Sequence, residues 1–207
     1  MNYKNNIPNA MVAVCPHRPF NCGHVGFGFE YPNGTWRVGA VEGSDWSQGN
    51  RFNGFWTKHV KNFDAAMNQF AYMRHLGAEY DRVKVMDMHP NVAPNPQFAD
   101  KVTKWVSLQK YELAGRNCMD SAYDILLAFG LGYTRTFLPR PEDNWFPNDW
   151  YNKLPASHEL VLQNVNVIQS SNTHNEPELA IECESLLPDW RDESSDQYIA
   201  TRQGSEY

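Results

Sequence analysis

Long apolar runs are absent from this chain, and this absence excludes several classes of protein. No stretch approaches the roughly 20 continuous apolar residues that a membrane helix needs. The start of the chain carries one early lysine and an apolar run of only five residues, Ala10 to Val14. That pattern is too weak for a secretory signal. We therefore expect no membrane span and a product that is cytoplasmic as synthesised, with export by a signal-less route left open.

Cysteine and basic charge are also scarce. Four cysteines in 207 residues do not make a dense disulfide framework. The net charge is −6, and no basic patch marks a nucleic-acid binder. Residues 176–207 hold nine acidic residues against two arginines, a net charge of −7, so the preceding residues carry +1. We expect one folded domain over residues 1–168 and an acidic, polar, disordered tail over residues 169–207.

Hydrophobic residues are plentiful enough for a packed core, at 42% of the chain, and their spacing predicts the elements. Apolar residues recur at helical spacing between Phe63 and Leu76, and an Asn95-Pro96 pair predicts the start of a second helix. Charged residues alternate with valine from Arg82 to Met86, which indicates a half-buried strand. Residues 138–156 are rich in Pro, Trp and Asn and predict an ordered loop, and residues 160–168 predict one more strand.

A hairpin is the clearest local feature. Residues 24–30 and 35–43 predict two strands joined by Tyr31-Pro-Asn-Gly34, a sequence that suits a three-residue loop. In that register Tyr31 pairs with Thr35, and Glu42 lies directly opposite His24 on the same face. A two-residue loop would turn Glu42 away from His24.

Cys118 stands at a predicted helix start. Asn117 is a good N-cap, and Asp120 three residues later completes a near capping box for a helix that runs to about Phe129. Unpaired amides and the helix dipole favour a thiolate there. An imidazole could take its proton, a carboxylate could orient that imidazole, and the Cys118 N–H could stabilise an oxyanion. We interpret Cys118 as nucleophile, His24 as base and Glu42 as the orienting residue.

These motifs resemble those of a known superfamily. The Gly23-His24-Val25-Gly26 strand opening, followed far downstream by Tyr111, Leu113, Asn117 and Cys118 at a helix start, resembles the circularly permuted papain-fold hydrolases. These are relatives of the NlpC-type cell-wall peptidases and of lecithin:retinol acyltransferase. The resemblance covers roughly residues 20–132 and implies Cys118 as nucleophile, His24 as base and a polar third residue at Glu42. Acyltransferase-like relatives usually carry histidine at that third position, so Glu42 favours a resemblance to the bacterial-type amidases.

The resulting expectation is an α+β protein of permuted papain type, with a small antiparallel sheet and the Cys118 helix packed on it. It would be a cysteine amidase or peptidase without a cofactor, cleaving a peptide or isopeptide amide, in peptidoglycan for example. A lipid or thioester acyl hydrolase or acyltransferase is the alternative within the same fold.

Three other readings stay open. Ligand chemistry allows a zinc knuckle built from Cys15, His17, Cys22 and His24. A disulfide could join Cys15 to Cys22. A non-catalytic binding module could use the loop around Trp145 and Trp150.

Overall fold

The computed structural model describes residues 9–17, 21–41, 54–73, 79–88, 92–109, 111, 116–133 and 138–162. Within these ranges the chain forms an α+β fold with one six-stranded antiparallel sheet and four α-helices. The strands follow the order β4-β3-β2-β1-β5-β6 across the sheet. The strands are β1 (Ala10–Cys15), β2 (His24–Glu30), β3 (Trp36–Val41), β4 (Phe55–Val60), β5 (Arg82–Met86) and β6 (His158–Val161). The helices are α1 (Phe63–Tyr72), α2 (Pro96–Ser107), α3 (Cys118–Phe129) and α4 (Pro147–Lys153).

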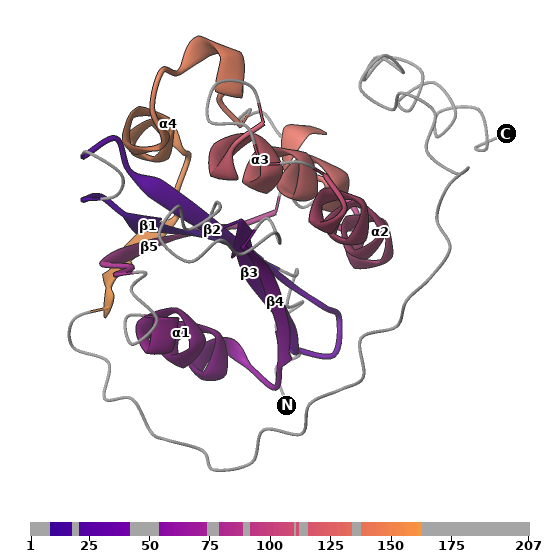
Figure 1. Cartoon of the computed structure of the whole chain (residues 1–207). Coiled ribbons are helices and arrows are strands. Elements are labelled where there is room, and N and C mark those ends of the chain that lie inside the picture. Colours follow the sequence, from indigo (N-terminus) through magenta and orange to yellow (C-terminus); the bar gives the residue numbers. More distant parts are fainter. Residues whose placement is uncertain are drawn as a thin grey trace, which may run out of the picture. The chain divides into compact units, whose positions relative to one another are not determined.

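The helices form a layer on each face of the sheet. Figure 1 shows α1 on one face, and α2, α3 and α4 on the other. The side chains of β2 point alternately towards the two helix layers, because successive side chains of a strand point to opposite faces of the sheet. A Cβ at Gly26 would lie 2.7 Å from the ring of Phe70 in α1. The ring of Phe29, three residues further along, lies 5.5 Å from that of Phe129 in α3.

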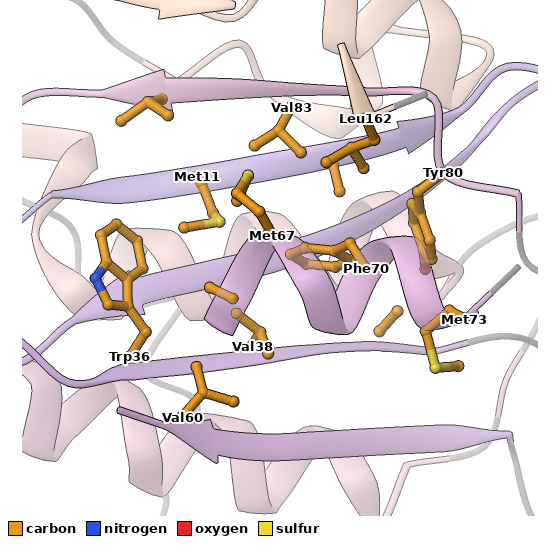
Figure 2. Packing of buried hydrophobic residues seen from close by; sticks show 14 of the residues in the cluster. Met11, Trp36, Val38, Val60, Met67, Phe70, Met73, Tyr80, Val83 and Leu162 are labelled. Carbon is orange, nitrogen blue, oxygen red and sulfur yellow. The ribbon is translucent and has the colours of Figure 1, made fainter. Parts of the chain in front are cut away.

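The face under α1 carries a hydrophobic core. Figure 2 shows Met67 and Phe70 of α1 packed against side chains from the strands, with Tyr80 and Met73 at one end and Trp36 at the other. Phe70 is fully buried and lies edge-on to the rings of Trp56 and Tyr80. Strand residues of this cluster are Met11, Ala13, Cys15, Trp36, Val38, Ala40, Val60, Val83 and Val85.

Three predicted helix starts are confirmed. Asn95 caps α2, accepting from the Phe98 N–H at 3.1 Å, and Pro96 occupies the first turn. Helix α3 begins at Cys118, and Gly130 ends it with a left-handed φ of 119°. Helix α1 begins at Phe63 as expected, and residues 74–78 at its predicted end lie outside the described residues.

Several local predictions were wrong or incomplete. The sheet is larger than expected, because the sequence pattern predicts neither β1, a short apolar run, nor β4 as a strand. All six residues of β1 are buried because β1 lies inside the sheet and helices cover both faces, which is why it shows no alternation. The predicted loop over residues 138–156 contains α4, which starts with Pro147 at its first position. The last strand begins earlier than predicted, at His158, and residues 163–168 lie outside the described residues, as does the predicted tail.

Helix α4 is held to the sheet at its C-terminal end by Lys84. The Lys84 ammonium on β5 donates to the carbonyl oxygens of Tyr151 (2.9 Å), Asn152 (3.0 Å) and Leu154 (3.4 Å). Carbonyls at a helix end lack partners within the helix, so a cation satisfies them well. Burial lowers the pKa of Lys84, and Arg82 lowers it further against the opposing effect of Glu159.

Replacing Lys84 with methionine is therefore expected to destabilise the protein by about 2 kcal/mol, because charge-assisted hydrogen bonds are lost while the apolar stem is kept. Urea unfolding followed by circular dichroism measures the change. Lys153→Met is the matched control: Lys153 is exposed in the last turn of the same helix, and its loss should cost less than about 0.5 kcal/mol. Equal losses in the two variants would contradict the role of Lys84.

Candidate active site

Cys118 occupies the first position of α3, and the predicted capping box is present in full. The Asn117 side-chain oxygen accepts from the N–H groups of Met119 (2.8 Å) and Asp120 (3.4 Å), and the Asp120 carboxylate accepts from the Asn117 N–H (3.1 Å). The cap therefore binds the second and third amides of the helix and not the first, which belongs to Cys118. Cys118 is buried, with 3% exposure.

The cysteine also faces the body of the protein, as the spacing predicted. Cys118, Ala122, Ile125 and Phe129 form one stripe along α3, and each is buried. Helix α3 packs mainly against β2 on one side and α2 on the other. The helix start is thus fixed by both its cap and its packing, which gives the thiol a defined position.

The residue before the cap is anchored as well. The Arg116 guanidinium lies 4.1 Å from the ring centre of Trp105 in α2, and its Nη2 is 3.3 Å from a carboxylate oxygen of Asp124 in α3. The Asp124 side chain is 2% exposed, so this is a nearly buried ion pair. The anchor was not predicted: Arg116 and Asp124 are eight residues apart, a spacing with no local structural signature. It holds the chain that enters α3 against both helices.

His24 is the first residue of β2 and is buried, with 4% exposure. Its partner in the antiparallel pair is Cys15, so both side chains point to the same face of the sheet. That face is the one covered by α1, because the His24 ring lies 5.8 Å from the ring of Tyr80, which belongs to the core under α1.

The side chain of His24 and the helix that carries Cys118 therefore lie on opposite faces of the sheet. Helix α3 packs on the face to which Phe29 points, whereas His24 points to the face that contacts Tyr80. In this conformation the sheet lies between the imidazole and the helix that carries the thiol. The structure brings Cys118 to the predicted helix start and His24 to the predicted strand start, but it does not bring the two side chains onto one face.

The hairpin has the predicted register. The Tyr31 N–H donates to the Thr35 carbonyl at 2.8 Å, and the Gly34 N–H donates to the Tyr31 carbonyl at 2.9 Å, which is the three-residue loop. Gly34 has a φ of 82° and supplies the positive value expected of it. The ladder then continues from Glu30↔Trp36 to Gly26↔Ala40. Glu42 lies outside the described residues, so its place opposite His24 stays a prediction.

The four residues of the alternative zinc knuckle are not gathered around one point. His17 is 74% exposed and its ring nitrogen lies 3.8 Å from a carboxylate oxygen of Asp81, whereas His24 is buried beside Tyr80. Cys15 and Cys22 are present as thiols. Within the part of the chain that the structure describes, no group of three or more His, Cys, Asp or Glu residues is placed to hold a metal ion.

The two tryptophans of the possible binding loop behave differently. Trp150 in α4 is fully buried, and its indole N–H donates to the Pro139 carbonyl at 2.5 Å, so it packs as a core residue. Trp145 is 91% exposed and precedes the half-exposed Phe146. Of these two tryptophans, Trp145 is therefore the one exposed for contact with another molecule.

No helix among the described residues has the length and apolar character needed to cross a membrane. Comparisons of the chain with protein-family models, with curated proteins and with solved structures find no match.

Proposed function

We propose that this chain is a cysteine hydrolase of the permuted papain type, with Cys118 as its nucleophile. The observation that carries the proposal is the thiol at the first position of a helix with a complete capping box, next to an amide that the cap does not bind. Such a position favours the thiolate and provides a donor for a developing oxyanion. The resemblance to NlpC-type peptidases rests on the same residues.

The reaction follows from this assignment. The Cys118 thiolate attacks an amide carbonyl carbon, and the Cys118 N–H stabilises the resulting oxyanion. The C–N bond breaks as the amine takes a proton from the protonated base, which leaves a thioester. Water, deprotonated by the same base, then attacks the thioester and releases a carboxylic acid and the thiol.

His24 is proposed as that base from the sequence motif, and Glu42 as the residue that orients it. The layer arrangement sets a clear condition on this assignment: the imidazole has to reach the α3 face of the sheet to accept the proton. The nucleophile and the base can therefore be tested separately.

The substrate we propose is a peptide or isopeptide amide, with peptidoglycan as the first candidate. Acyl groups of lipids or thioesters are the second candidate, because the same thioester intermediate can form from either type of acyl donor.

Competitive alkylation tests the nucleophile, because exposure and activation predict opposite orders of reaction. Cys22 is the more accessible thiol, whereas Cys118 is buried. An activated Cys118 is nevertheless expected to react with iodoacetamide at pH 6 about 10-fold faster than Cys22, because an ordinary thiol is well under 1% thiolate there. Peptide mapping by mass spectrometry follows each site. Faster labelling of Cys22 at every pH would refute the activation of Cys118.

The variant His24→Gln tests the base in the same assay. If His24 pairs with the thiol, its loss should lower the alkylation rate of Cys118 at pH 6 about 10-fold and remove one inflection from the pH profile. Cys118 alkylation that keeps the wild-type profile in this variant would leave Cys118 as nucleophile and exclude His24 as its base.

A further inference from the structure

The residue Asn148 binds the chain on both sides of the turn that leads to His24. Its side-chain Nδ2 donates to the carbonyl oxygens of Pro16 and Asn21, each at 2.9 Å. Its backbone N–H donates to the Cys22 carbonyl at 3.1 Å. Pro16 follows β1 directly, and Cys22 lies two residues before His24. One asparagine more than 120 residues away thus connects the end of β1 to the start of β2.

The backbone of this turn contains two residues with positive φ. Asn21 has a φ of 65° and Gly23 a φ of 91°, values in the left-handed region that most residues avoid but that asparagine and glycine adopt readily. A Cβ at Gly23 would meet the side-chain amide of Asn148 and would lie 2.8 Å from its backbone nitrogen. Gly23 therefore allows α4 to approach closely, and the hydrogen bonds from Asn148 fix the position of the turn against α4.

Helix α4 is itself held in place by contacts with the rest of the protein. Its far end is bound by Lys84 of β5, and Trp150 anchors its middle in the protein interior. Because the helix is fixed at these points, Asn148 in its first turn has little freedom to move. The position of the His24 backbone is then determined by α4 as well as by its own strand.

We propose that Asn148 is a positioning residue for His24: by binding Pro16, Asn21 and Cys22 it fixes where β2 starts and hence where the imidazole lies. The importance of this role for catalysis rests on the proposed function, in which His24 is the base. Asn148 itself needs no contact with substrate. The effect on His24 can be measured whether or not the protein is a hydrolase.

The test is an NMR titration of histidine-labelled protein, with the His24 signal assigned by its loss in His24→Gln. Asn148→Ala is expected to move the His24 ring signals and to change the pH midpoint of their titration. The matched control Asn152→Ala removes the same side chain from an exposed position of the same helix, and it keeps the main-chain carbonyl that Lys84 binds. The control should leave the His24 signals at their wild-type positions.

A second variant covers the case in which Asn148→Ala does not fold. Asn148→Asp keeps the size of the side chain but cannot donate from it, so both Nδ2 hydrogen bonds are lost. A folded variant of either kind with an unchanged His24 titration would overturn the proposal.

Activity separates this inference from the proposed function. If His24 is the base, Asn148→Ala should lower kcat about 10-fold to 100-fold with KM nearly unchanged, because misplacing a catalytic group affects the chemical step. A displaced His24 signal in a protein whose wild type hydrolyses nothing would support the positioning role and refute the proposed function. An unmoved signal in an active enzyme would do the opposite.

Discussion

Cys118→Ala is expected to abolish hydrolysis, with a fall in kcat of about 10⁴-fold or more, as seen when a nucleophile is removed from a hydrolase. The reason is chemical: no atom in the variant can form the thioester. The protein should remain folded, since a methyl group replaces a small buried side chain and the cap by Asn117 and Asp120 is unaffected. The measurement is product analysis by mass spectrometry on purified peptidoglycan and, in parallel, on an acylated lipid.

Two further variants make this result interpretable. Cys118→Ser keeps the shape of the side chain and replaces the thiol by a poorer nucleophile, so it too should be inactive or nearly so. Cys22→Ala removes the more accessible thiol and should keep wild-type activity if Cys118 alone is the nucleophile. Unchanged turnover in Cys118→Ala would refute the mechanism. A wild-type protein that converts neither substrate would refute the proposed peptidoglycan and acyl-lipid activities. Only the α+β fold would then remain supported.

The parts of this structure that could be predicted from the sequence are those determined by neighbours in the chain. The capping box depends on Asn117 and Asp120, within four consecutive residues, and the hairpin loop depends on Pro32 and Gly34. Both were predicted with the right register because turn and cap preferences are short-range effects. The start of α2 at Asn95-Pro96 belongs to the same group.

The features that could not be predicted are those that depend on which face of the sheet each helix covers. The alternation along β2 shows that His24 and Phe29 point in opposite directions, but no local pattern states that α3 packs on the side of Phe29. That choice arises from long-range packing. The contacts of Asn148 with Pro16 and Asn21 escape the sequence for the same reason, because hydrogen bonds across 127 residues or more leave no periodic signal.

The short helix α4 was missed for a different reason. Its sequence does contain a start signal, Pro147, and a basic last turn with Lys153. At seven residues it is too short to show helical periodicity, and isolated helices of that length are unstable. It forms because Lys84 binds its C-terminal carbonyls and because Trp150 and Tyr151 are fully buried. Tertiary contacts, and not helix propensity, determine this element.

Phe70→Ala is expected to be among the most destabilising single substitutions in this fold, with a loss of about 4 kcal/mol in the free energy of unfolding. Phe70 is fully buried and makes edge contacts with the rings of Trp56 and Tyr80. Below it lies Gly26, which has no side chain to fill the vacated space, so the cavity should collapse poorly. Urea unfolding measures the loss. Tyr72→Ala, which removes a 43% exposed ring from the same helix, should cost about 1 kcal/mol or less.

The glycine provides a sharper test of the same packing. In the wild type, a Cβ at Gly26 would lie 2.7 Å from the Phe70 ring, so Gly26→Ala is expected to destabilise the protein. In the Phe70→Ala background that methyl group enters the cavity, and its cost should fall by about 1 kcal/mol or more in a double-mutant cycle. Additive effects would show that Phe70 does not fill the space over Gly26. Because Tyr80 also contacts the His24 ring, the loss of Phe70 should further displace the His24 NMR signals, which links the core under α1 to the proposed base.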